Sequence, residues 1–498
     1  MELREKPMCF ERAPDEPIIF RRLYFYRQAT GNGAERTEIK MTRNDRNASP
    51  LHTRSQNKKR QRRSRSIIFI LQVLSLFLCL SVIVLSSLLI ARTIKKNEAA
   101  MQKQQPVSTT APIVSETSAA TSTTSAAPTP VPVTERLPAS PNAESFFGEF
   151  PAVESLEEIR RFPAKAIYIS DAQNVESCIG LANRSEVDSF VVDLKESSGV
   201  RFASQHPLAP DSGPLHDSYS GYGGLRGFIE KCHENDIKII GRIVCFKDPE
   251  FARKYPERSI RDESGNQLLY TLENSTPFLS PYDTRNWDYL IELALEAVEA
   301  GIDEIQFDYV RFPTGNTVSG TSSYYGDPAT LPTRAEAINR FLQTARRRIQ
   351  DEYGIPVSAD IFGIVLSSET DGEYLGQDWS SIGLTGVSVL APMVYPSHYA
   401  LNTVLNEVFF EMPDFHPHDV VYNALMHGKP AADAEGFSAV RPYLQAFTAS
   451  YITPGTWQTY DYGKINDQIR AVYDAGYEEW ILWNATVQYP DGAYDGNN

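Results

Sequence analysis

The stretch Gly301–Pro313, GIDEIQFDYVRFP, decides the fold of this chain. It begins with a glycine just after an apolar helical run and ends with a proline, so a short strand fits between them. A carboxylate on the inner face, at the carboxyl end of such a strand, is typical of a closed barrel. The alternative is a buried strand whose aspartate caps a nearby helix. Residues two apart on a strand share a face, which predicts Gln306, Asp308 and Val310 inside and Phe307 and Tyr309 outside.

Strand-like runs alternate with helical runs through the rest of the chain from about residue 146. This alternation predicts a parallel sheet, and eight units predict a (β/α)8 TIM barrel. The alternative, an open doubly wound sheet, requires a glycine-rich first turn that AIYISDAQN lacks. The predicted strands are Ala166–Ser170, Ser189–Lys195, Lys238–Phe246, Glu304–Phe312, Val357–Gly363, Gly386–Tyr395, Arg441–Phe447 and Glu478–Ala485, and the predicted helices are Gly223–Asn235, Thr284–Ala300, Arg334–Tyr353 and Gly463–Ala475.

Charge divides the 498 residues into two parts: residues 1–100 carry a net charge of +11, and the remainder carries −26. The acidic part argues against a nucleic-acid partner, because such binding requires a basic face. Ile67–Ala91 is apolar for 25 residues, which is long enough to cross a bilayer. The basic run His52–Ser66 precedes it and predicts a cytoplasmic N-terminus.

These features predict four segments. Residues 1–66 form a disordered basic arm in the cytoplasm, and residues 67–91 form a single transmembrane helix. Residues 92–145 form a linker, because a stretch rich in Thr, Ser, Ala and Pro buries too little apolar surface to fold. Residues 146–498 form the barrel. We therefore expect a single-pass protein of the cell membrane with an extracytoplasmic barrel.

Polar side chains recur near the carboxyl ends of the predicted strands. Burying such groups costs free energy unless they are paired, so their recurrence from strand to strand indicates a functional rim. Parity along the other strands predicts shared faces for Val191, Asp193 and Lys195; Ile240, Arg242 and Val244; Ser358 and Asp360; Met393 and Tyr395; Tyr443 and Gln445; and Trp480, Leu482 and Asn484, with Trp483 opposite.

Asp308 and Asp360 come from neighbouring predicted strands. Glycosidic cleavage needs two carboxyl groups at one centre, one a protonated acid and the other an ionised base or nucleophile. We expect Asp308 to be the nucleophile or base and Asp360 the proton donor. Other chemistries find less support, because the chain has no GxSxG elbow and no CxxC pair, and its HxH pair, 416–418, lies in a predicted loop.

Seven segments, distributed from about Ala164 to Tyr489, resemble a bacterial family described as a "putative glycoside hydrolase domain". They are VVDLKESSG, GRIVCFKDPEFARKYPE, EIQFDYVRFP, SADIFG, APMVYPSHY, RPYLQAF and EEWILWNA. The resemblance implies a TIM barrel, often secreted or membrane-anchored, with glycoside hydrolase activity. The matched segments include Asp193, Asp308, Arg311, Asp360, Tyr395, His398, Gln445 and Trp483.

We therefore expect a membrane-anchored, extracytoplasmic glycoside hydrolase acting on a polysaccharide or oligosaccharide of the cell envelope or the environment. The expected mechanism needs no metal or organic cofactor. Two alternatives remain: a non-catalytic carbohydrate-binding barrel and a structural cell-envelope protein. The expected substrate-binding residues are Asp193, Lys195, Arg242, Arg311, Tyr395, His398, Gln445 and Trp483.

Overall fold

The structure is a computed structural model that describes residues 135–150 and 158–497. In this part of the chain, eight parallel strands pair in sequence order, and the last pairs with the first, so the sheet closes into a barrel. All eight predicted strands are confirmed, most of them with shorter ends. They are β1 (Lys165–Ser170), β2 (Ser189–Glu196), β4 (Lys238–Val244), β5 (Glu304–Asp308), β6 (Val357–Phe362), β7 (Val389–Met393), β11 (Tyr443–Gln445) and β12 (Trp480–Trp483).

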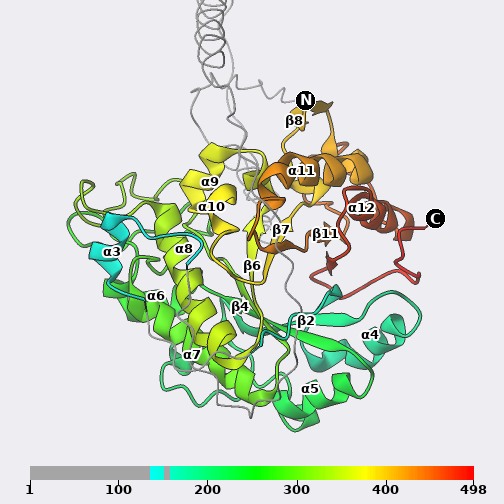
Figure 1. Cartoon of the computed structure of the whole chain (residues 1–498), viewed down its shortest axis with the longest axis horizontal. Coiled ribbons are helices and arrows are strands. Elements are labelled where there is room, and N and C mark those ends of the chain that lie inside the picture. Colours follow the sequence, from blue (N-terminus) through cyan, green and yellow to red (C-terminus); the bar gives the residue numbers. More distant parts are fainter. Residues whose placement is uncertain (1–134, 151–157, 498) are drawn as a thin grey trace, which may run out of the picture. The chain divides into compact units, whose positions relative to one another are not determined.

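Helices lie around the outside of these strands (Figure 1). The four predicted helices are confirmed as α5 (Leu225–His233), α7 (Thr284–Ala300), α8 (Arg334–Ala345) and α12 (Tyr462–Asp474), with α8 continuing into a π-helix at Arg346–Asp351. The predicted loop at residues 416–418 is wrong, because Pro417 begins a helix there. The helices that the pattern missed include α4 (Val175–Ala182), α9 (Glu369–Leu375), α10 (Trp379–Ile382) and α11 (Pro417–Ala432).

Two unusual backbone conformations delimit β5. Gly301 ends α7 in the left-handed region with φ 101°, which favours glycine. The strand then ends four residues earlier than predicted, because Tyr309 adopts φ 50°. This turn ends the alternation of faces, so the prediction for Val310 is wrong: its side chain belongs to the outer core between strands and helices.

The hydrophobic core has two layers on opposite faces of the sheet. A small cluster fills the barrel interior, and a much larger one lies between the strands and the helices. On β12 the predicted faces are reversed: Trp480 and Leu482 lie in the outer layer, and Ile481 and Trp483 lie inside. The register explains this, because Ile481 pairs with Ala166 and Tyr443, which both face the interior.

A buried ion-pair cluster lies at the amino end of the barrel. Arg441, just before β11, donates from Nη1 to Glu304 Oε1 at 2.8 Å and from Nε to Glu479 Oε2 at 2.8 Å. Arg161 also pairs with Glu479, and Ser358 Oγ donates to Glu304 Oε1 at 2.6 Å. Each carboxylate therefore has cationic and hydrogen-bonding partners, and the cluster ties together β5, β6, β11 and β12.

The segment 135–150 contacts the helical layer. It contains α3 (Pro141–Phe147), and Glu135 accepts hydrogen bonds from Gln343 at 3.0 Å and Arg346 at 2.7 Å. Part of the predicted linker thus lies against α8. The predicted arm and the predicted membrane segment, 67–91, lie outside the described residues. Across the part that is described, we find no helix with the length and apolarity needed to span a bilayer.

Candidate active site

Asp308 and Arg242 form a buried pair at the carboxyl end of the barrel. The guanidinium donates from Nε and Nη2 to Asp308 Oδ2 at 2.9 and 2.6 Å. The backbone N–H of Tyr309 donates to Asp308 Oδ1 at 2.5 Å, a contact that the left-handed turn makes possible. Charge-assisted hydrogen bonds of this kind stabilise an ionised carboxylate and fix its position. The Asp308 side chain remains 9% exposed.

Asp193 of β2 occupies the other side of Arg242. It accepts Nη1–H of the guanidinium on Oδ1 at 2.5 Å and the Tyr168 hydroxyl on Oδ2 at 2.6 Å. Burial raises the pKa of Asp193 to about 6; Arg242 opposes this shift, and the charge of Glu196 adds to it. One guanidinium therefore joins carboxylates from two strands.

Asp360 lies on β6, next to Asp308. The two residues stand one position beyond the paired residues Phe307 and Ala359, so their backbones are about 5 Å apart across neighbouring strands. Asp360 is 2% exposed, and its Oδ1 has no hydrogen-bond partner among the described residues. Burial, followed by the negative charge of Asp308, raises the pKa of Asp360 well above its usual range. Burial and the neighbouring negative charge therefore favour the protonated form of Asp360.

Trp483 and His398 form the more accessible part of the site. Trp483 is half-buried, its ring lies 4.0 Å from that of Tyr168, and the Arg242 guanidinium lies 5.3 Å from its centre. Tyr395 is buried and lies 5.0 Å from the ring of His398, which is exposed. Flat aromatic surfaces beside polar groups suit the faces and hydroxyls of sugar rings.

Lys195 lies away from this group, although its sequence parity matches that of Asp193. The pairing of β2 with β4 shifts register between these two residues, which is the mark of a β-bulge. Lys195 is fully buried, pairs with Asp248 at 2.9 Å and donates to the carbonyl of Val244 at 2.9 Å. The ammonium group of Lys195 therefore makes structural contacts at the rim of the barrel.

Arg311 and Gln445 also make structural contacts. Arg311 is buried and donates to Glu273 at 2.9 Å, and Thr314 Oγ1 donates to the same carboxylate oxygen at 2.6 Å. Gln445 is buried and donates to Asp414 at 3.1 Å. Of the predicted residues, the structure brings together Asp193, Arg242, Asp308, Asp360, Tyr395 and Trp483, with His398 at the exposed edge.

Three site residues were missing from the predicted set. Tyr168 holds Asp193, and the Tyr443 hydroxyl donates to Gln306 Oε1 at 2.6 Å. Gln306 Nε2 is buried without a hydrogen-bond partner in the described residues. Parity along β1, applied as on the other strands, places Tyr168 on the same face as the buried interior residue Ala166. Within residues 135–150 and 158–497, no group of three His, Cys, Asp or Glu is arranged to hold a metal ion.

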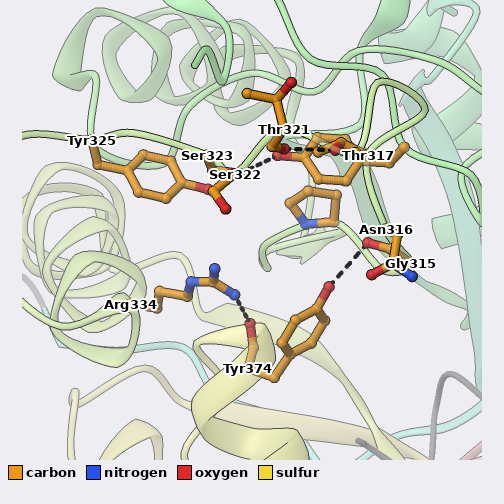
Figure 2. Close-up of a pocket in the computed structure, with 12 residues that line it drawn as sticks. Gly315, Asn316, Thr317, Thr321, Ser322, Ser323, Tyr325, Arg334 and Tyr374 are labelled. Carbon is orange, nitrogen blue, oxygen red and sulfur yellow. Dashed lines mark hydrogen bonds between the residues drawn. The ribbon is translucent and has the colours of Figure 1, made fainter. Parts of the chain in front are cut away.

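A separate cavity of about 430 Å³ opens on the loop between β5 and α8 (Figure 2). It shares no lining residue with the carboxylate cluster. The cavity is lined by Tyr270, Pro313, Gly315, Asn316, Thr317, Gly320, Thr321, Ser322, Ser323, Tyr325, Arg334 and Tyr374.

An eight-stranded parallel barrel with carboxylates at the carboxyl ends of neighbouring strands is an arrangement that glycoside hydrolases use. The family model described as "Putative glycosyl hydrolase domain" matches residues 165–489. The chain belongs to this family, which confirms the resemblance seen in its sequence. No curated protein matches the chain.

Several solved structures are similar to this one. A hypothetical protein from Ruminiclostridium thermocellum is 34% identical, over 39% of this chain and 96% of its own, with a TM-score of 0.34. The PgaB (BpsB) glycoside hydrolase domain from Bordetella bronchiseptica is 10% identical, over 66% and 94%, with a TM-score of 0.44. The α-galactosidase TtGalA from Thermus thermophilus is 10% identical, over 69% and 61%, with a TM-score of 0.37.

Proposed function

We propose that the protein is a glycoside hydrolase that uses Asp308 and Asp360 as its two catalytic carboxyl groups. The observation that carries the proposal is the contrast between them. Asp308 is held by the guanidinium of Arg242. Asp360, in contrast, has an oxygen without a hydrogen-bond partner among the described residues and a pKa raised well above its usual range. Glycosidic cleavage requires one charged and one protonated carboxyl group close to the same glycosidic bond.

In the proposed first step, a carboxylate oxygen of Asp308 bonds to the anomeric carbon. The glycosidic carbon–oxygen bond breaks, and the proton of Asp360 passes to the leaving oxygen. In the second step, Asp360 takes a proton from water, and the resulting hydroxide displaces Asp308 from the sugar. A retaining sequence needs the two carboxyl groups about 5 Å apart, and side chains on neighbouring strands, whose backbones are about 5 Å apart, can come that close.

Arg242 and Asp193 act as positioning residues in this scheme. The guanidinium fixes the Asp308 carboxylate and compensates its charge, while Asp193, which accepts a hydrogen bond from Tyr168, holds the guanidinium. Trp483, Tyr395 and His398 line the proposed sugar-binding surface. The two proposed steps use protein side chains and water, and they require no metal or organic cofactor.

The setting of the activity is also a proposal. The apolar segment 67–91 and the basic residues before it support a single membrane anchor with a cytoplasmic N-terminus. The barrel would then act outside the cytoplasm, on a polysaccharide or oligosaccharide of the cell envelope or the environment.

The test is a screen for reducing ends released from a panel of glycans by the full chain. We expect turnover of at least one glycan and its loss in Asp308→Asn, with thermal unfolding showing that the variant is folded. Turnover that survives Asp308→Asn contradicts the assigned role. Binding of a glycan without any product, equal in both proteins, would instead support a carbohydrate-binding barrel.

A further inference from the structure

The cavity on the β5–α8 loop has walls that are held in place. The backbone N–H of Thr271 donates to Asn316 O at 2.9 Å, and that of Val318 donates to Leu269 O at 2.7 Å. Tyr270 and Thr317 form an antiparallel bridge between the same two segments. The cavity is therefore formed before any ligand arrives, and its volume of about 430 Å³ lies within the range of small-molecule sites, about 300–1,000 Å³.

Hydroxyl groups and tyrosine rings dominate the lining. Figure 2 shows Arg334 and Tyr374 on one side of the cavity, with Tyr325, Ser322 and Ser323 across from them. The Tyr374 hydroxyl donates to Gly315 O at 3.2 Å, and the Tyr270 and Ser323 hydroxyls lie 2.8 Å apart. Such a surface offers hydrogen bonds to several hydroxyls of one ligand and aromatic faces to its apolar side, as a sugar ring requires.

Arg334 is the one charged residue in this lining. Its Nη1 donates to the carbonyl of Tyr374 at 2.6 Å, but it forms no ion pair within the described residues. Its positive charge acts on the surrounding phenols: it opposes the burial that raises the pKa of Tyr374 to about 12, and it does the same for Tyr270 and Tyr325. Among the described residues, the bond to Tyr374 is the one hydrogen bond of the guanidinium, so its other N–H donors can face a cavity whose lining includes no carboxylate.

We propose that this cavity binds the carboxylate of an acidic saccharide, such as a uronic acid residue of the glycan substrate. The planar guanidinium of Arg334 provides two parallel donors that match a carboxylate, and the serine and tyrosine hydroxyls take the sugar hydroxyls. The cavity would give the protein a preference for acidic over neutral glycans.

Position in the fold connects this cavity to the proposed active site. The loop that forms it leaves β5 directly after Asp308, and Arg311 and Thr314 anchor its first turn to Glu273. The cavity thus belongs to the loops at the carboxyl end of the barrel, where barrels bind their ligands. The identity of the saccharide as part of a substrate rests on the proposed function, whereas the binding of a carboxylate by Arg334 does not.

Calorimetric titration of the full chain with glucuronic acid and with glucose tests the proposal. We expect glucuronic acid to bind at least tenfold more tightly than glucose, and Arg334→Gln to weaken glucuronic acid binding at least tenfold. Arg334→Lys keeps the charge without the planar pair of donors, so intermediate binding is expected. Arg348→Gln is the matched control: it removes an arginine that pairs with Asp288 outside the cavity, and it should leave binding unchanged.

The outcomes separate this proposal from the proposed function. Loss of glucuronic acid binding in Arg334→Gln, with binding retained in Asp308→Asn, supports the cavity site even if no hydrolysis is found. Equal binding of glucose and glucuronic acid, or binding unaffected by Arg334→Gln in a protein with unchanged thermal unfolding, overturns it even if Asp308-dependent hydrolysis is established.

Discussion

Two arginine-centred clusters lie at opposite ends of the barrel interior, and they differ in their balance of charge. At the amino end, Arg441 and Arg161 serve the two carboxylates of Glu304 and Glu479. At the carboxyl end, Arg242 alone serves Asp193 and Asp308, and Asp360 stands next to them as a third carboxyl group.

We interpret this difference as one between a structural role for the amino-end cluster and the proposed catalytic role of the carboxyl-end cluster. A buried ion pair with all its hydrogen bonds made holds strands together, and breaking it leaves an unpaired charge. A third carboxyl group buried beside such a pair has a raised pKa, which favours the protonated form that acid catalysis needs. The carboxyl end of a barrel is also where chemistry is found, while the amino end serves stability.

The largest expected effect is on catalysis, from Asp360→Asn. With the proton donor removed, kcat/KM on an unactivated glycan should fall by roughly 10²–10⁴. A 4-nitrophenyl glycoside of the same sugar needs little protonation of its leaving group, so the fall in kcat/KM for this substrate should be much smaller. Equal losses on both substrates would contradict the role of Asp360 as an acid.

The matched change at the amino end is Glu304→Gln. The substitution removes the charge of one of the two buried carboxylates that pair with Arg441. We therefore expect the free energy of unfolding in urea to fall by about 3–5 kcal/mol. Turnover per folded molecule should remain within about twofold. If this variant keeps its stability but loses activity, the division of roles between the two clusters is wrong.

The pH dependence of stability should reveal the surplus carboxyl group. Asp360 has a raised pKa when folded, so as the pH rises above about 4, the usual pKa of an aspartate, the unfolded chain loses a proton that the folded chain keeps. The free energy of unfolding should therefore fall as the pH rises above this value. In Asp360→Asn the fall should be smaller; identical slopes in the two proteins would argue against a protonated Asp360.

The smallest expected effect comes from Trp483→Ala at the accessible edge of the carboxyl-end cluster. Loss of its ring should weaken glycan binding by about 1 kcal/mol, roughly a fivefold rise in KM, with kcat little changed. Trp480→Phe on the outer face of the same strand is the control, and its KM should match that of the unmodified protein. A large fall in kcat for Trp483→Ala would place this residue closer to the chemistry than proposed.

Much of the site could be predicted from strand parity. Asp193, Arg242, Asp308 and Asp360 lie together because residues two apart on parallel strands face the same way and the strands begin at one end. Parity failed where the strand was irregular: the bulge after Asp193 takes Lys195 out of the group, and the left-handed turn at Tyr309 takes Val310 out.

Local periodicity and composition were sufficient to predict the eight strands along the chain and the carboxyl groups near their ends. Only the tertiary structure decided how the charges are shared. Whether a buried arginine pairs with one carboxylate or two depends on register and on side chains from distant strands, and no local pattern records that. The contrast between the satisfied cluster around Arg441 and the surplus carboxyl group beside Arg242 is therefore a property of the folded barrel.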